Sequence, residues 1–320
     1  MKKLFLTLSA LLLAAGLSFA QNMSDATDAV KAANDAIQEE NYDSALAGFQ
    51  KALEIAQQCG DEGAELVGQC KNQIPKIALA AAKAQAKAQN FEAALQGLDK
   101  AIALANECGG AEEVIADAQE LIPDIHVMNG NDNLRNQKYP EAVAAYKAAL
   151  EVKPDHAKAA LLLGQALSQS GDIPGAIAAF KEAAKFEENA ASAAKMLANL
   201  NLKQANANYQ GGKLKEAVDL AMECFSAEGV ADNVKNSAAS IIAGCVQKAA
   251  MGNNFSGAAS FYNKLAGVDA NNNKLGQLAY TIGACYYKAK NTGAAKEWLK
   301  KALNDPKVGA NAKQLYDAIK

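Results

Sequence analysis

The chain has 320 residues, half of them apolar, and only 6% are aromatic. That length and apolar share allow either a large core or one long array of stacked repeats. The formal charge of −3 is not that of a polyanion-binding protein, so nucleic acid is excluded as an expected partner.

The first twenty residues have the three-part layout of a secretory signal peptide. Lys2 and Lys3 precede a nearly unbroken apolar stretch over residues 4–17, and small residues lead to a cut expected between Ala20 and Gln21. The alternative is a membrane anchor, but the stretch is too short to span a bilayer comfortably. No later segment is apolar enough to cross a membrane. The prediction is therefore a periplasmic or secreted protein with no transmembrane segment after signal removal, and the lysine start and alanine-rich leader favour bacterial export.

One helical pattern recurs seven times along the rest of the chain. Its first copy reads Tyr42, Ala45, Phe49 and Ala52, and these spacings of three and four place the residues on one stripe of a helix. The alanines at the second position of the pattern are Ala45, Ala94, Ala142, Ala176, Ala217, Ala258 and Ala295.

A second helical pattern precedes each copy and ends in a polar turn. Twelve residues before the repeat alanine stands a small residue in six of seven copies, with Val246 as the exception. A small residue at that position lets two helices cross closely. The turns are Glu40–Asn41, Gln89–Asn90, Gln137–Lys138, Gly171–Asp172, Gly212–Lys213, Asn253–Asn254 and Lys290–Asn291.

Two segments of this pattern closely resemble the tetratricopeptide repeat. They are residues 130–154, with Gly130, Tyr139, Ala142 and Tyr146, and residues 163–183, with Gly164 and Ala176 among others. The resemblance extends, in degenerate form, over most of residues 26–304. It implies an all-α fold, a right-handed α-solenoid of about seven TPR-like helix hairpins.

The repeat lengths depart from the family period of 34 residues. The repeat alanines are separated by 49, 48, 34, 41, 41 and 37 residues, and the first two intervals carry matching insertions around Pro75 and Pro123. These insertions predict long first helices over residues 64–88 and 111–136, each kinked at its proline. Residues 308–319 are expected to form a capping helix, because a stack must cover its last apolar face.

The domain organisation follows from these repeats. Residues 1–20 are the signal peptide, 21–136 the elongated repeats 1–2, 137–304 repeats 3–7 and 305–320 the C-terminal cap, with the first helix of repeat 3 beginning near residue 111.

The family resemblance implies that the concave face is lined by the first helix of each hairpin and receives a peptide or helix. The residue eleven before each repeat alanine is expected to point there, and six of seven are amides or lysine. Amides both donate and accept, so they can pair with an extended backbone; the alternative is that these are ordinary solvated positions. The six predicted groove residues are Asn34, Lys83, Asn131, Gln165, Asn206 and Gln247.

A narrower family site, the grip on a C-terminal carboxylate, is not supported. Asn34 matches its first position, but Ala80 stands where a second asparagine is needed. Asp124 and Met128 stand where cations are needed.

Six cysteines in an exported chain permit disulfides. The candidate pairs are Cys59 with Cys70 and Cys224 with Cys245, and each would contribute roughly 2–4 kcal/mol. Cys224 also occupies a repeat position where other copies have alanine, so a small buried residue is the alternative there. No Cys-x-x-Cys motif occurs, which argues against a zinc or redox site.

Enzyme chemistry has little support in the sequence. The two histidines, His126 and His156, have no nucleophile or metal partner at a recognisable spacing, and there is no glycine-rich phosphate loop. The prediction is a protein without catalytic activity, cofactor or metal.

The expected function is a protein–protein interaction scaffold in the bacterial cell envelope, with a partner peptide or helix in the groove. The alternative is a periplasmic holding chaperone or assembly factor for envelope or secreted proteins. A hydrolase or carrier with its site in the groove is the remaining hypothesis.

Overall fold

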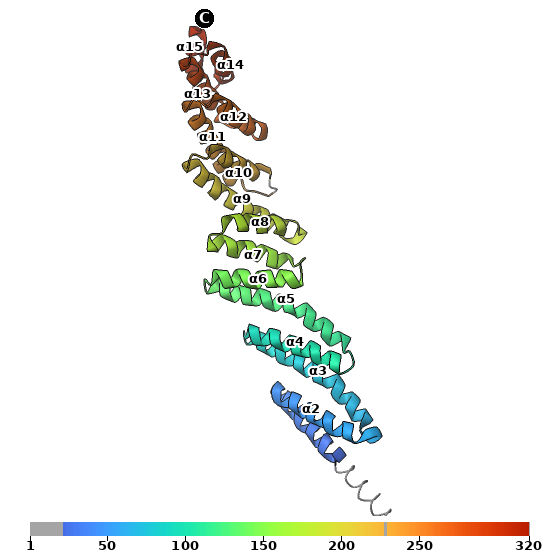
Figure 1. The fold of residues 1–320 in the computed structure, drawn as a ribbon. Helices are drawn as coiled ribbons and strands as arrows, with labels where there is room; N and C mark the ends of the chain where they lie inside the picture. Colours follow the sequence, from blue (N-terminus) through green and yellow to red (C-terminus); the bar gives the residue numbers. More distant parts are fainter. Residues whose placement is uncertain (1–21, 227–228, 320) are drawn as a thin grey trace, which may run out of the picture. The chain divides into compact units, whose positions relative to one another are not determined.

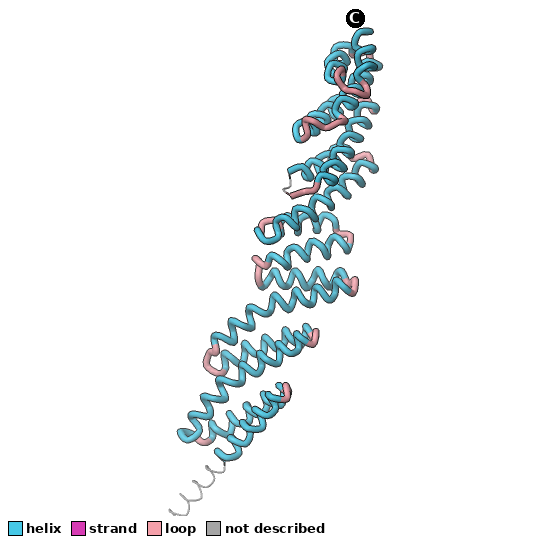
Figure 2. The backbone as a smooth tube through the Cα atoms, turned by 180° about the vertical axis from the view of Figure 1, so that it is seen from behind, coloured by secondary structure: helices cyan, strands magenta, loops and turns pink. Residues whose placement is uncertain are grey.

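The computed structural model describes residues 22–226 and 229–319. The predicted signal segment and its cut lie outside the described residues. Within the described residues all regular structure is helical, and short loops join the helices (Figure 2). The chain divides into two compact units, Met1–Ala159 and Ala160–Lys320, and the division falls inside α7 (Ala157–Ser170).

The first unit consists of consecutive helices that pack as hairpins (Figure 1). It begins with a helix over residues 22–38. The elements that follow are α2 (Tyr42–Gln58), η1 (Gly60–Gly63), α3 (Ala64–Lys87), α4 (Phe91–Glu107), α5 (Glu112–Arg135) and α6 (Tyr139–Val152).

The second unit continues the same pattern after the start of α7, with each helix packed on its neighbours along the chain. Its further elements are α8 (Ile173–Ala183), α9 (Glu187–Gln210), α10 (Leu214–Ser226), α11 (Asp232–Met251), α12 (Phe255–Val268), α13 (Leu275–Lys288), α14 (Thr292–Ala302) and α15 (Gly309–Ala318). The repeated all-helical hairpins confirm the predicted fold class.

Every predicted turn has a residue in the left-handed region, which reverses the chain between two helices. These residues are Glu40, Gln89, Gln137, Gly171, Gly212, Asn253 and Lys290, with φ between 55° and 89°. The following residue precedes the second helix, and in four hairpins its side chain accepts a hydrogen bond from the backbone N–H three residues on. The four capping residues are Asn41, Asp172, Asn254 and Asn291.

The core of each hairpin is the predicted stripe, and all seven repeat alanines have no exposed surface. In several hairpins a glycine on one helix lies against a side chain of the other helix. Gly130 lies against the ring of Tyr146 and Gly164 against the ring of Phe180, whereas Ala33 and Ala82 face Gly48 and Gly97. In each of these four contacts one of the two residues is a glycine, which lets the two backbones approach closely.

The predicted long first helices are α3 and α5, whose ends lie within one residue of the expected ones. Both continue through a buried proline, Pro75 and Pro123. Two further long helices, α9 and α11, have no such insertion and were not singled out by the sequence. The predicted cap is α15, which packs on α13 and α14.

No helix of the described residues combines the length and apolarity needed to cross a membrane.

Candidate functional site

Two adjoining hollows lie on the first helices of the second unit. The first, of about 390 Å³, lies between α7 and α9 and has Gln165 and Met196 in its wall. The second, of about 470 Å³, lies between α9 and α11 and includes Asn206 and Ser240. Asn199 and Lys203 of α9 line both hollows, so the two form one continuous surface, which we call the amide groove.

The positions of the groove residues on α9 follow from helical geometry. Asn199, Lys203 and Asn206 are spaced by four and three residues and therefore share one face of the helix. The opposite face is buried, with Ala198 and Ala205 in the core cluster of this unit. Burial of the alanine face thus fixes the rotation of α9 and turns the polar stripe outward.

The three polar side chains on this stripe are not committed to other contacts. Within the described residues, Asn199, Lys203 and Asn206 have no hydrogen-bond or ion-pair partner, and all three are exposed. By contrast, Ser240 donates to the Asn236 carbonyl at 2.8 Å and accepts from Lys274 Nζ at 2.8 Å. The groove therefore offers amide donors and acceptors and one free ammonium group.

The groove has apolar walls and lacks negative charge. Phe180, Met196 and Leu200 line the first hollow, and Leu202 and Ile241 line the second. No acidic side chain is among the described residues lining either hollow. Such a surface suits a segment that buries apolar side chains while its backbone pairs with the amides, and Lys203 would favour a carboxylate nearby.

Of the six groove residues predicted from sequence, the structure brings Gln165 and Asn206 to the amide groove. Gln165 Nε2 also contacts Met196 Sδ at 3.5 Å. Gln247 is exposed and lies two turns beyond Ser240 on α11.

The other three predicted residues belong to the first unit and have different surroundings. Asn34 is exposed on the first helix. Lys83 forms an ion pair with Asp117 at 3.2 Å. Asn131 Oδ1 accepts a hydrogen bond from Tyr146 Oη at 2.9 Å, so this amide links the two helices of its own hairpin.

Asn199 and Lys203, which join the two hollows, are not among the residues predicted from the sequence. The prediction covers one position per repeat, whereas α9 presents three polar residues on one stripe. A search for polar stripes along each first helix would have found them.

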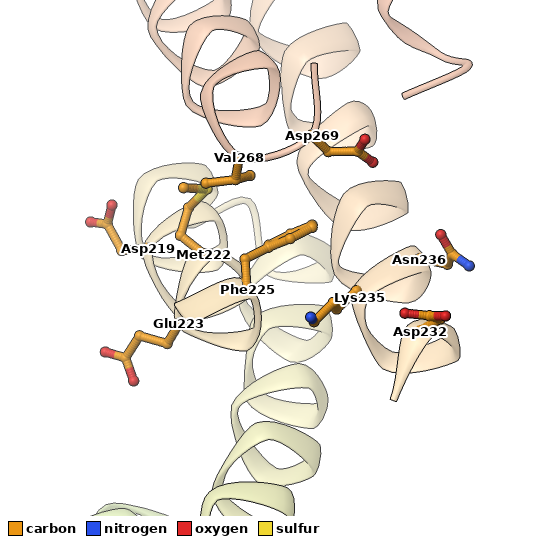
Figure 3. A pocket seen from close by; sticks show the side chains of 9 residues that line it. All are labelled: Asp219, Met222, Glu223, Phe225, Asp232, Lys235, Asn236, Val268 and Asp269. Carbon is orange, nitrogen blue, oxygen red and sulfur yellow. The ribbon is translucent and has the colours of Figure 1, made fainter. Parts of the chain in front are cut away.

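A larger hollow, of about 800 Å³, lies among α10, the first turns of α11 and the end of α12. Figure 3 shows Met222 beside Val268 at the end of α12 and the ring of Phe225 extending toward α11, while Asp219 and Glu223 turn to another side of α10. Asp219 pairs with Lys264 at 2.5 Å, and Glu223 accepts from Asn201 Nδ2 at 2.8 Å. The carboxylates of Asp219 and Glu223 are therefore held by other side chains and do not converge on a common point in this hollow.

The two histidines lie outside the hollows. His156 Nε2 lies 3.1 Å from Asp124 Oδ1. His126 is half-buried, and this burial lowers its pKa, while Glu151 acts in the opposite direction. No group of three or more His, Cys, Asp or Glu residues suited to a metal ion occurs in the part of the chain that the structure describes.

All six cysteines are free thiols in the structure. Cys59 Sγ donates to the Ile55 carbonyl and Cys224 Sγ to the Ala198 carbonyl. Burial raises the pKa of Cys224 and of Cys245 to about 11, which keeps both thiols protonated near neutral pH. The pairings Cys59–Cys70 and Cys224–Cys245 remain predictions for an oxidising compartment.

Comparison with known proteins places tetratricopeptide repeats in the centre of the chain. The tetratricopeptide repeat family profile matches residues 127–195, which include Gly130, Tyr146, Gly164 and Phe180. No curated protein sequence matches the chain.

Similar solved structures include several tetratricopeptide repeat proteins. The MamA protein is 18% identical, with 60% of this chain and 96% of that chain covered and a TM-score of 0.29. YrrB, described as a TPR protein with an unusual peptide-binding site, is 17% identical (74% and 91% covered, TM-score 0.28). A tetratricopeptide repeat protein from Parabacteroides merdae is 13% identical (92% and 98% covered, TM-score 0.25). At these scores the superpositions carry no argument about function.

Proposed function

We propose that this tetratricopeptide repeat protein is a non-catalytic interaction scaffold of the bacterial cell envelope that binds an extended segment of a partner protein in the amide groove. The continuity of the two hollows through Asn199 and Lys203 carries the proposal. It provides a surface longer than one hairpin, as an extended segment requires. The proposed envelope location rests on the signal-like residues 1–20.

The polar groups of the groove support binding of a peptide backbone. Three uncommitted side chains on one helical stripe can pair with successive backbone groups, while Met196 and Leu200 contact apolar side chains. Their exposure means that little desolvation opposes binding, so we expect selectivity to come mainly from the apolar walls.

The test is a variant with Asn199→Ala, Lys203→Ala and Asn206→Ala, examined with a partner identified by cross-linking in intact cells. We expect purified full-length variant to bind that partner at least about tenfold more weakly, a loss of roughly 1.4 kcal/mol or more. The matched control is Lys215→Ala with Glu216→Ala, two exposed residues of α10 outside both hollows. Equal affinity of the triple variant, the control and the unsubstituted protein would reject the groove as the binding surface.

Binding stoichiometry and aggregation assays on the same proteins distinguish a scaffold from a holding chaperone. A scaffold binds one partner at a fixed stoichiometry and leaves the aggregation of unrelated unfolded proteins unchanged. Suppression of aggregation across unrelated substrates, lost in the triple variant, would instead favour the chaperone.

A further inference from the structure

The small net charge of the chain hides a strong segregation of sign. Residues 1–159 contain 22 acidic and 14 basic side chains, whereas residues 160–320 contain 13 acidic and 18 basic ones. The imbalance is concentrated in the first and the last hairpins.

The first hairpin is acidic, and we call residues 22–63 the acidic end. It carries nine carboxylates and only two lysines, and all nine acidic residues are exposed. Asp28, Asp35 and Glu39 are spaced by seven and four residues, which places them on one stripe of the first helix. The other acidic residues are Asp25, Glu40, Asp43, Glu54, Asp61 and Glu62.

The last hairpin and its cap are basic, and we call residues 288–319 the basic end. It carries seven lysines against three acidic residues. A hollow of about 550 Å³ between α14 and α15 is lined by three lysines and one acidic residue, beside Gly293 and Tyr316: Lys296, Lys300, Lys301 and Glu297. Lys301 Nζ lies 4.0 Å from the centre of the Trp298 ring, so aromatic faces support part of this cluster.

Neither end neutralises its own charge. The ion pairs of the described residues all lie between Lys83 and Lys264 in the sequence, and none involves the acidic or the basic end. At each of the two ends, one sign of charge therefore remains in excess.

The need for a soluble surface on the terminal hairpins does not explain why each end carries mainly one sign of charge. The terminal hairpins of a stack need a polar outer surface for solubility, and a mixture of both signs provides it. A single sign at each end repels an identical end and attracts the opposite one. Contact between unlike ends is a heterologous interface, which can join many molecules into a closed ring or an open chain.

We propose that the partner of the basic end is the acidic end of a second copy of this chain, so that the protein associates head to tail. This association is separate from peptide binding in the amide groove and uses different residues. Because the charges are exposed and the Debye length is only about 8 Å at physiological salt, the contact weakens as ionic strength rises.

The experiment uses the full chain without its signal segment and two charge-reversed variants. One has Lys300→Glu, Lys307→Glu and Lys313→Glu, and the other has Asp28→Lys, Asp35→Lys and Glu39→Lys. All six positions are exposed, and circular dichroism verifies that each variant retains its helix content. Sedimentation velocity then measures the average mass at about 0.05 M and about 0.5 M salt.

We expect the unsubstituted protein to associate at low salt and to dissociate at high salt. The lysine-reversed variant has an excess of acidic residues at both ends, and the other variant keeps six acidic residues against five lysines at its acidic end, so each alone should associate more than about tenfold more weakly. An equimolar mixture of the two variants should regain association, because the acidic end of one then meets the basic end of the other.

Three results would overturn the proposal. The first is an unsubstituted protein that stays monomeric at low salt. The second is a mixture that remains as dissociated as its components. The third is binding of polyglutamate to the basic end without self-association, which would assign that end to a different acidic partner.

Discussion

The hydroxyl of Tyr146 donates a hydrogen bond to Oδ1 of Asn131 at 2.9 Å, across the hairpin of α5 and α6. Tyr146 has no exposed surface, and burial raises its pKa to about 12. Asn131 and Asn206 hold the same position in their repeats, yet only Asn206 is free to meet a partner. Equivalent residues of a repeat protein can therefore have different roles.

This difference predicts unequal effects on stability. Asn131→Ala leaves the buried Tyr146 hydroxyl without its acceptor, so we expect a loss of about 1 kcal/mol in the free energy of unfolding. Asn206→Ala removes an exposed amide and should change that free energy by less than about 0.5 kcal/mol. Urea unfolding followed by circular dichroism measures both. A double-mutant cycle with Tyr146→Phe should show coupling for Asn131 and none for Asn206.

Gly130 provides a second test of the same hairpin. A Cβ at this position would lie 2.5 Å from Tyr146 Cε1, and the ring is fully enclosed. We expect Gly130→Ala to cost about 1–3 kcal/mol despite the better helix propensity of alanine. Gly68→Ala in α3 is the control, because its added Cβ meets nothing within 4 Å and should stabilise the helix. A Gly130→Ala variant as stable as the control would contradict the close approach of the two helices.

The hairpin turns predict a stabilising substitution. Lys138 precedes α6 with φ −84° and ψ 70°, nearly the backbone of Asn254, but it makes no side-chain cap. We expect Lys138→Asn to supply the missing hydrogen bond and to add about 0.5–1 kcal/mol to the free energy of unfolding. Asn254→Ala should lose a similar amount, since Asn254 Oδ1 accepts from Gly257 N–H. Denaturation midpoints of the two variants should thus shift in opposite directions.

The stability of the first unit should fall on mild acidification. Burial lowers the pKa of His126 below its ordinary value of 6.5. The unfolded chain therefore takes up a proton at this residue before the folded chain does, and stability declines as pH falls below about 6.5. The slope attributable to this residue should stay below about 1.4 kcal/mol per pH unit, the value for one full proton.

The substitution His126→Gln tests whether His126 causes this pH dependence of stability, because glutamine does not titrate. Urea unfolding at several pH values between about 7.5 and 5 should show a shallower decline for the variant. Identical slopes for the two proteins would assign the pH dependence to other groups.

The sequence by itself determined the repeated helical pattern, the turns and the buried stripe, although not the lengths of α9 and α11. These features depend on local rules: a period near 3.6 residues, small residues at close crossings and a left-handed residue in each turn. For this reason the seven repeat alanines and the seven turn residues were found without coordinates. The family profile over residues 127–195 matches the segment where these rules are followed most closely.

The tertiary structure alone decided which polar residues are free and which are committed. The partner of Asn131 lies 15 residues away and that of Lys83 lies 34 residues away, on neighbouring helices whose packing the local pattern does not fix. Likewise, Asn199 and Lys203 become part of a groove only because α7 and α11 flank α9. Periodicity shows which face of a helix is buried, whereas the neighbours of the exposed face depend on how successive hairpins pack.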